Sequence, residues 1–292
     1  MLTVLPQLVV SGIATGMLYA LIALSMTVLY RATTVVNFGH GDLVMVGAYG
    51  VLVFTLTVGL PFIPAFLLSI AVLFLIGVAI HLALIRPILD GPHLSLAMMA
   101  LAAGYAMRGG ARLEWGQDAM TTPRPYAQDA YFMGGVVFTT DDIVITAVVL
   151  ALLTVLFVVF YLTRFGKIIQ AIFQNQRGAA LVGINVNAYQ ALMWGIGAAL
   201  AAVGGMLLAL MVLVTPDMGV WTLVRGFAAM TLGGFGSLHG AVIGGIVLGI
   251  LEKLLGFYVS TAFIDITAYI VTIVVLLIRP RGLFGQHATL RI

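Results

Sequence analysis

Three polar side chains lie within six positions near the start of the chain, in the stretch TTVVNFGHGDLVMVGAYG (33–50). Asn37, His40 and Asp42 are separated there by glycines. Glycine-rich breaks in a membrane helix expose backbone N–H and C=O groups, and such breaks occur where protein or a water-filled path covers them. The stretch therefore predicts a structural and gating role beside a polar pathway for Asn37, His40, Gly41 and Asp42.

A second interpretation of the same stretch is that it lies at the membrane surface. Arg31 is close by, and polar residues just beyond the end of a span are ordinarily solvated. A charge at the bilayer centre costs about 2.5–3.5 kcal/mol on insertion scales, so a carboxylate placed there needs a purpose. The sequence favours the gating role, and the interfacial role stays open.

The composition identifies the solvent around these residues as lipid. Of 292 residues 62% are hydrophobic and 8% are charged, and the mean hydropathy is +1.18; a soluble domain has about 25% charged residues. The chain has no cysteine, which excludes thiol catalysis and cysteine-bound metal. No phosphate-binding loop, HExxH helix or Gly-x-Ser-x-Gly elbow occurs, so we expect no enzyme activity, no metal and no cofactor bound by this chain.

Long apolar runs define the membrane elements that must position the polar stretch. They fall at about 8–30, 43–60, 62–85, 94–108, 141–163, 189–214, 221–236, 239–258 and 262–278. We predict an all-α integral membrane protein: a polytopic helical bundle of about eight to nine membrane segments with broken or re-entrant helices. Residues 1–292 are expected to form a single membrane domain that includes the segment 164–188.

The basic residues predict the orientation of the spans. Arg31, Arg86, Arg164 and Arg279 each follow an odd-numbered run, which places the N-terminus outside and the C-terminus in the cytoplasm. Three arginines break this pattern, and we expect nearby acids in an outer loop over 109–140 to balance them; these are Arg108, Arg112 and Arg124, with Glu114, Asp118 and Asp129.

Two further acidic residues lie in the last spans. Glu252 and Lys253 are neighbours, so on a helix they point about 100° apart and do not pair with each other. Asp265 opens the last span and is expected to interact with the N-terminus of that helix. We assign no proton relay to either carboxylate.

The stretch at 226–245 contains seven glycines, including Gly233 and Gly234. Close packing of helix backbones is the ordinary explanation, and a translocation path lined by backbone, with His239 beside it, is compatible with it. His239-Gly240 also echoes the His-Gly pair at 40–41. Repeated halves with helix breaks at matching places are typical of transporters, although chance similarity explains two short matches equally well.

Residues 164–188 form an extended hydrophilic segment on the predicted cytoplasmic side. Apolar side chains recur in it at helical spacing, which predicts an amphipathic helix-turn-helix at the membrane surface, ended or turned by Gly183. From the residues alone, a helix resting among lipid headgroups and a helix docking on a partner are equally good explanations.

Five fragments occur in one order along nearly the whole chain: VVNFGHGDLVMVGAY, EWGQD, RGAALVGIN, LGGFGSLHGAVIGGIVLGILE and RPRGLFG. Together they resemble the permease subunits of branched-chain amino acid ABC importers, specifically the shorter of the two paired permeases. The resemblance implies a multi-pass protein of the bacterial inner membrane. It implies four kinds of partner: a second homologous permease, two ATP-binding subunits, a periplasmic solute-binding protein and membrane lipid, with no nucleic acid.

The resemblance also implies roles for particular residues. Gly166, Ala179, Ala180 and Gly183 match the cytoplasmic loop that docks on the ATPase, where ATP and Mg²⁺ are used. Three positions depart from the family pattern: Gly39 stands where alanine is common, Asp42 where glutamate is common, and Gln170 where a basic residue is usual.

The resulting hypothesis is a permease subunit that forms half of the translocation pathway for branched-chain amino acids or a related small polar solute. The alternative is a stand-alone channel or facilitator for a small neutral or zwitterionic solute of the urea or amide type. An intramembrane enzyme is the third and least favoured class. Transport by the isolated chain in liposomes distinguishes the second hypothesis from the first.

Overall fold

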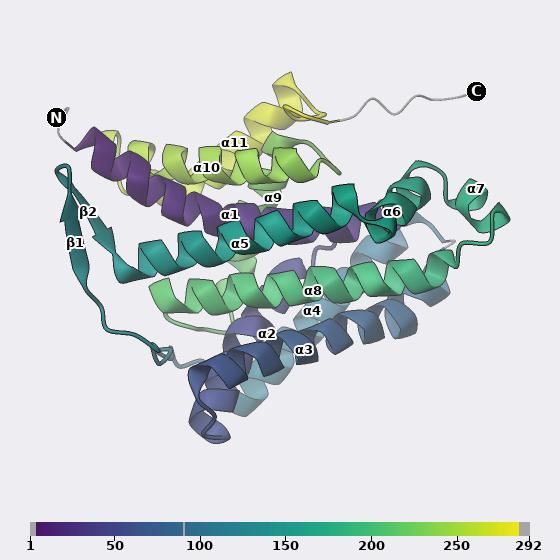
Figure 1. Cartoon of the computed structure of the whole chain (residues 1–292), viewed down its shortest axis with the longest axis horizontal. Helices are drawn as coiled ribbons and strands as arrows, with labels where there is room; N and C mark the ends of the chain where they lie inside the picture. Colours follow the sequence, from purple (N-terminus) through teal and green to yellow (C-terminus); the bar gives the residue numbers. More distant parts are fainter. Residues whose placement is uncertain (1–3, 90, 286–292) are drawn as a thin grey trace. The chain divides into compact units, whose positions relative to one another are not determined.

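The computed structural model describes residues 4–89 and 91–285. Its helices are α1 (Leu5–Thr33), α2 (His40–Leu52), α3 (Phe62–Ile80), α4 (His93–Trp115), α5 (Thr140–Leu162), α6 (Arg164–Gln174), α7 (Gln176–Leu181), α8 (Val186–Met211), α9 (Met218–Gly233), α10 (Leu238–Tyr258) and α11 (Phe263–Ile278) (Figure 1). Two strands, β1 (Ala130–Met133) and β2 (Val136–Thr139), form an antiparallel hairpin.

Each apolar run expected from the sequence coincides with one of these helices, and the remaining two helices, α6 and α7, lie in the expected cytoplasmic segment. Within the described residues, six helices are long and apolar enough to cross a membrane: α1, α2 with its extension to Thr57, α3 with its extension to Ile88, α5, α8 and α10. The predicted helical membrane fold is confirmed. The β1–β2 hairpin is an addition that the sequence did not predict.

The hairpin lies within the expected outer loop at 109–140, and that loop is shorter than expected. Helix α4 continues to Trp115, where Gly116 ends it with a φ of 71°. In the hairpin, the Gln7 side chain of α1 donates to the Val137 carbonyl (3.0 Å) and accepts from the Val137 amide (2.7 Å). These two bonds attach the hairpin to the start of α1, beside which it stands in Figure 1.

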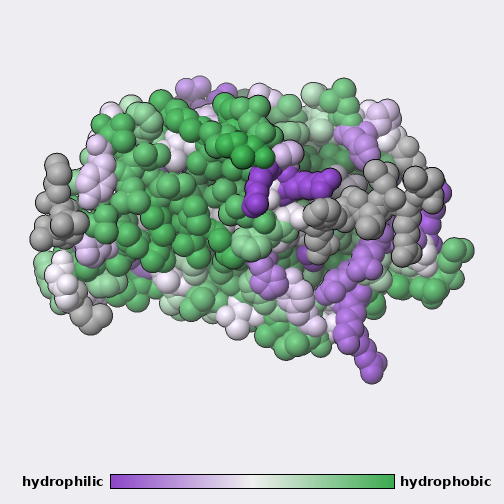
Figure 2. Space-filling view, turned by 90° about the horizontal axis from the view of Figure 1, so that it is seen from above, coloured by the Kyte–Doolittle hydropathy of each residue, from purple (hydrophilic) through white to green (hydrophobic). Residues whose placement is uncertain are grey.

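The backbone divides into two compact units. The first consists of Met1–Thr27, Gln128–Thr146 and Val224–Ile292, and the second of Val28–Ala127 and Ala147–Leu223. Large hydrophobic side chains remain exposed on many helices; on α11 they include Tyr269, Ile273, Leu277 and Ile278. Figure 2 shows such a surface, with hydrophobic residues over most of one face. Lipid contact explains this exposure.

In the first unit, glycines bring α1 and α10 into backbone contact. Gly12 and Gly16 are one turn apart on α1 and lie against Ile250 and Ile246 of α10; Gly249 of α10 lies against the same two glycines. Such small-residue pairs at a spacing of four let membrane helices pack closely.

In the second unit, α8 is the most buried of the six long apolar helices, and α2 and α3 both pack along it. A Cβ on Gly205 of α8 would collide with the Val44 carbonyl of α2, and a Cβ on Gly47 of α2 would collide with Ala202 of α8. A Cβ on Gly77 of α3 would lie 2.5 Å from the Trp194 carbonyl oxygen of α8. The core of this unit therefore depends on close approach of backbones.

We predict that Gly205→Ala destabilises the protein by about 1–3 kcal/mol, because the added methyl group overfills the contact with Val44. Gly109→Ala is the matched control, because a Cβ there meets nothing within 4 Å and alanine is preferred to glycine inside a helix by about 0.5–1 kcal/mol. Thermal unfolding in detergent measures both. Equal midpoints for the two variants would contradict the packing role of Gly205.

Candidate functional site

The polar stretch at 37–42 lies at a break between two helices. Helix α1 ends at Thr33, and α2 begins at His40. The Asn37 side chain accepts a hydrogen bond from the Gly39 amide (2.9 Å) and so holds the turn into α2. The sequence prediction of a helix break is confirmed, and in this structure Asn37 stabilises the break itself.

Asp42, in the first turn of α2, forms a buried ion pair with Arg108 of α4. The Asp42 Oδ1 atom lies 2.9 Å from Arg108 Nε and 2.7 Å from Arg108 Nη2. The side chain of Asp42 is 2% exposed and that of Arg108 is 14% exposed. Each charge therefore compensates the other in surroundings that would penalise either alone.

The ion pair lies beside the middle of α4, which has 23 residues. Gly104, the middle residue of α4, touches Asp42: a Cβ on Gly104 would collide with Asp42 Oδ2. Asp42 is therefore enclosed by α4 as well as by its own helix, and the gating and interfacial interpretations of the stretch both stay predictions.

Helix α9 also begins at this place. Gly219, in its first turn, contacts the Gly41 backbone at the start of α2, and a side chain on either glycine would collide with the other. Asp217, just before α9, pairs with Arg112 of α4, one turn beyond Arg108. The N-termini of two helices thus meet beside two ion pairs. Helix N-termini carry partial positive charge, and transporters direct such ends of discontinuous helices at their solutes.

Two of the three exceptional arginines pair with acids other than the expected ones. Arg108 pairs with Asp42 and Arg112 with Asp217, and Arg124 donates to the Leu210 carbonyl (2.6 Å). The reason is that α4 continues as a helix through these positions, which directs Arg108 and Arg112 at neighbouring helices rather than at acids in the following loop.

The glycine-rich stretch at 226–245 belongs to the first unit, so the structure does not bring Gly233, Gly234 and His239 into one unit with Asp42. Gly233 packs on Gly240 across the α9–α10 turn, and Gly234 has a φ of 106°. The Leu283 and Phe284 amides donate to the Leu232 and Gly233 carbonyls (2.9 Å each). Helix packing is therefore what these glycines do in the structure. His239 is an exposed residue in the first turn of α10.

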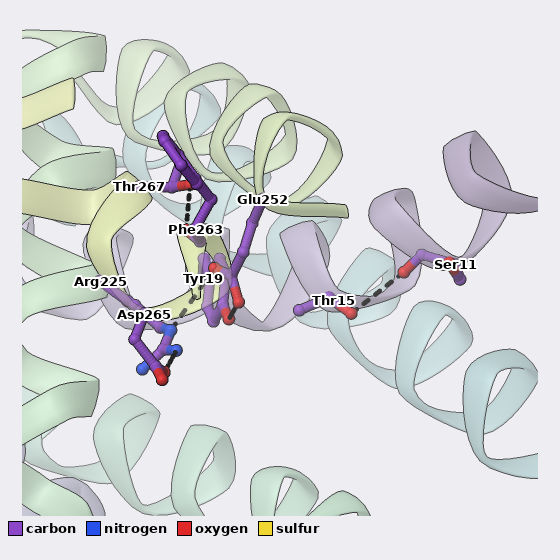
Figure 3. Close-up of polar contacts among 8 residues, drawn as sticks. All are labelled: Ser11, Thr15, Tyr19, Arg225, Glu252, Phe263, Asp265 and Thr267. Carbon is purple, nitrogen blue, oxygen red and sulfur yellow. Dashed lines mark hydrogen bonds and ion pairs between the residues drawn. The ribbon is translucent and has the colours of Figure 1, made fainter. Parts of the chain in front are cut away.

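A second buried charge cluster, in the first unit, was missed by sequence reasoning. Glu252 of α10 accepts from Tyr19 Oη of α1 (3.1 Å) and from Arg225 Nε of α9 (3.4 Å), and Arg225 also pairs with Asp265 of α11 (3.2 Å) (Figure 3). Four helices thus meet at one network. Only the rarity of charges in apolar helices could have pointed to it, because its members are far apart in sequence.

Residues 164–188, which the sequence predicts to be cytoplasmic, contain a helix-turn-helix, as predicted. Asn175 ends α6 and caps α7, accepting from the Gly178 amide (2.8 Å). Gly183 follows α7 with a φ of 86°, the left-handed backbone that favours glycine. Gly166 lies against the Phe160 backbone. Arg31 stacks over the Phe173 ring of α6 at 5.4 Å, which holds α6 on the end of α1 within the second unit.

Comparison with known proteins gives one consistent picture. The family model for the permease component of branched-chain amino acid transport systems matches residues 8–279. The high-affinity branched-chain amino acid permease LivH of Salmonella typhimurium is 30% identical, over 96% of this chain and 95% of the relative. BraD of Pseudomonas aeruginosa is 31% identical over the same shares. The probable LivH of Methanocaldococcus jannaschii is 32% identical, over 92% of this chain and 89% of the relative.

One solved structure also matches along the chain: PsaBC from Streptococcus pneumoniae in complex with Fab. It has a TM-score of 0.46 and 18% identity, covering 96% of this chain and 91% of that one.

The Asp42–Arg108 pair gives a double-mutant prediction. Arg108→Gln leaves a buried carboxylate without its cation, which typically costs about 3–5 kcal/mol. Adding Asp42→Asn removes that charge too, so the double variant should regain much of the lost stability. Thermal unfolding of the two single variants and the double variant gives the coupling energy. Additive losses would show that the two side chains do not compensate each other.

For the four-helix network we predict that Glu252→Gln lowers stability more than Tyr19→Phe. The first change removes the buried carboxylate charge that faces Arg225, while the other carboxylate of the network, Asp265, is exposed; the second removes one hydrogen bond, worth about 1 kcal/mol. Lys253→Gln, at the next position, is the control and should stay within about 0.5 kcal/mol of the parent. A loss at Lys253 as large as at Glu252 would refute the network.

Proposed function

Because the chain belongs to the family of permease components of branched-chain amino acid transport systems, we propose that it is the inner-membrane permease subunit of an ABC importer. In this proposal it forms half of the translocation pathway for branched-chain amino acids or a related small polar solute. The match to permeases along almost the whole chain carries the proposal. The chain then acts as a transport component, and ATP hydrolysis with Mg²⁺ takes place on partner subunits.

The gate in this proposal is the place where α2 and α9 begin. An amino acid crosses as a zwitterion, so it needs partners for both of its charges at depth. The Asp42–Arg108 pair offers one group of each sign, and the backbones at Gly41 and Gly219 approach closely enough for a small shift to open or close the contact. Because the pair is neutral overall, it can be buried at lower cost than either charge alone.

The partners proposed are a second homologous permease, two ATP-binding subunits and a periplasmic solute-binding protein, with lipid around the spans. The α6–α7 segment is the proposed contact with an ATP-binding subunit. The segment connects α5 to α8. Its first helix, α6, is the most amphipathic of the described helices, with Ile169 and Ile172 buried within its own unit.

The structure changes which residues of this segment can reach a partner. Ala179 is 5% exposed and Gly166 is buried, so both serve the packing of the segment. Leu181 is 88% exposed and Val182 is 76% exposed, next to the exposed Ala180 and Gly183. Two aliphatic side chains projecting from a polar turn are costly in water, and a hydrophobic groove on a partner would relieve that cost. We therefore place the proposed contact at 180–183.

The proposal is tested by reconstitution. The purified chain alone in liposomes should not move branched-chain amino acids, whereas the complex with its partner permease, ATP-binding subunits and solute-binding protein should take them up with ATP. Uptake by the chain alone would favour the stand-alone facilitator.

Coupling gives a more local prediction. Leu181→Asp with Val182→Asp should reduce co-purification of the ATP-binding subunits and ATP-dependent uptake, while the level of the permease in the membrane stays normal, because the exposed side chains contribute little to folding. Gln174→Glu, an exposed change at the end of α6, is the matched control and should leave both unchanged. Full co-purification and full uptake by the double variant would remove this segment from the coupling role.

A further inference from the structure

An apolar pocket lies between α2, α3 and α4 of the second unit. Its volume is about 360 Å³, within the range of about 300–1,000 Å³ found for small-molecule sites. Its lining comes from all three helices and is almost wholly aliphatic or aromatic: Met45, Val46, Tyr49, Gly50, Val53, Phe54, Val72, Leu73, Met107, Gly110, Ala111 and Trp115.

The pocket lies further along the same helix faces that carry the ion pair of the proposed gate. On α2, Met45 lies three residues and Tyr49 seven residues after Asp42, so all three share one face of the helix. On α4, Ala111 and Trp115 stand in the same relation to Arg108. The two faces meet, because Asp42 pairs with Arg108 at one end and the Tyr49 ring stacks on Trp115 at the other, with centroids 4.9 Å apart.

One polar atom at the pocket has no use within the fold. Tyr49 is 2% exposed, and its hydroxyl has no hydrogen-bond partner among the described residues. A buried hydroxyl without a partner typically costs about 1–3 kcal/mol, so it is seldom kept without a role. A polar group of a bound solute would supply the missing partner.

We propose that this pocket receives the aliphatic side chain of the transported amino acid while the charged groups of the solute lie at Asp42 and Arg108. The inference rests on the proposed function and deepens it, since it assigns part of the solute selectivity to the permease. The ammonium group of the solute pairs with Asp42 and its carboxylate with Arg108. The two charged groups of the solute thereby replace the contact between Asp42 and Arg108, and each of these side chains keeps an opposite charge beside it. Met45, one turn beyond Asp42, is the first pocket residue that the side chain meets.

Adjacent glycines provide a matched test. Gly110 lines the pocket, whereas Gly109 does not, and a Cβ on either meets nothing within 4 Å. Gly110→Leu therefore adds a side chain to the wall of the pocket from a Cβ position that is open, and Gly109→Leu adds the same side chain to the same helix outside the pocket. Gly110→Ala is a smaller step in the same direction.

The measurement is uptake by the complete transporter in vesicles, with leucine and alanine competing at a fixed amount of solute-binding protein. The solute-binding protein has its own preference between leucine and alanine. Dividing the leucine-to-alanine uptake ratio of each variant by that of the parent removes this preference from the result. Gly110→Leu should lower the leucine-to-alanine ratio about tenfold, the effect of a methylene-sized misfit in a hydrophobic pocket. Gly110→Ala should lower it less, and Gly109→Leu should leave it unchanged.

The outcomes separate this inference from the proposed function. If the parent complex takes up no amino acid, the proposed function fails. If the parent complex transports amino acids but Gly110→Leu slows the uptake of leucine and alanine equally, the pocket does not hold the solute side chain. The same conclusion follows if Gly110→Leu and Gly109→Leu give the same leucine-to-alanine ratio. A lipid chain is then the occupant of the pocket.

Discussion

A buried carboxylate has to be compensated by an opposite charge, and much of the second unit can be understood from that constraint. The compensating cation, Arg108, is on α4, so the first turn of α2 must lie beside the middle of α4. Gly104 is required there because any side chain would occupy the space of Asp42. The break between α1 and α2 allows the first turn of α2 to reach this place.

Glycine-mediated backbone contact is the second feature shared by both units. Between lipid-covered helices there is little hydrophobic driving force, because lipid chains are as apolar as leucine, so close packing carries the association. Gly16 against Ile246 in the first unit and Gly205 against Val44 in the second are contacts of this kind. The charge networks then fix which helices meet: Arg225 contacts carboxylates of both α10 and α11.

The sequence predicts the helices well because lipid offers no hydrogen-bond partners to the backbone. A segment in lipid must therefore form its backbone hydrogen bonds internally, as a helix does, and the apolar runs mark where such segments lie. The break at 37–42 was also predictable, from glycines beside polar side chains. The partners of the charges were not. Asp42 and Arg108 are 66 positions apart, and a helical period describes only neighbours on one helix. Similarly, the resemblance assigned Ala179 to the loop that docks on the ATPase, whereas in the structure Ala179 is buried and the exposed residues are the larger Leu181 and Val182.

The distance in sequence between Asp42 and Arg108 also has a consequence for biosynthesis. Helix α2 is the least hydrophobic of the six long apolar helices, and it leaves the ribosome before its counter-charge exists. At about 5–20 residues per second, the 66 residues between the two take roughly 3–13 s to make. During that interval Asp42 has no cation from α4, so α2 has to wait at the water–lipid boundary or beside the insertion machinery. Its final position is reached only after α4 has been synthesised, and the order of synthesis therefore differs from the order in which the helices settle.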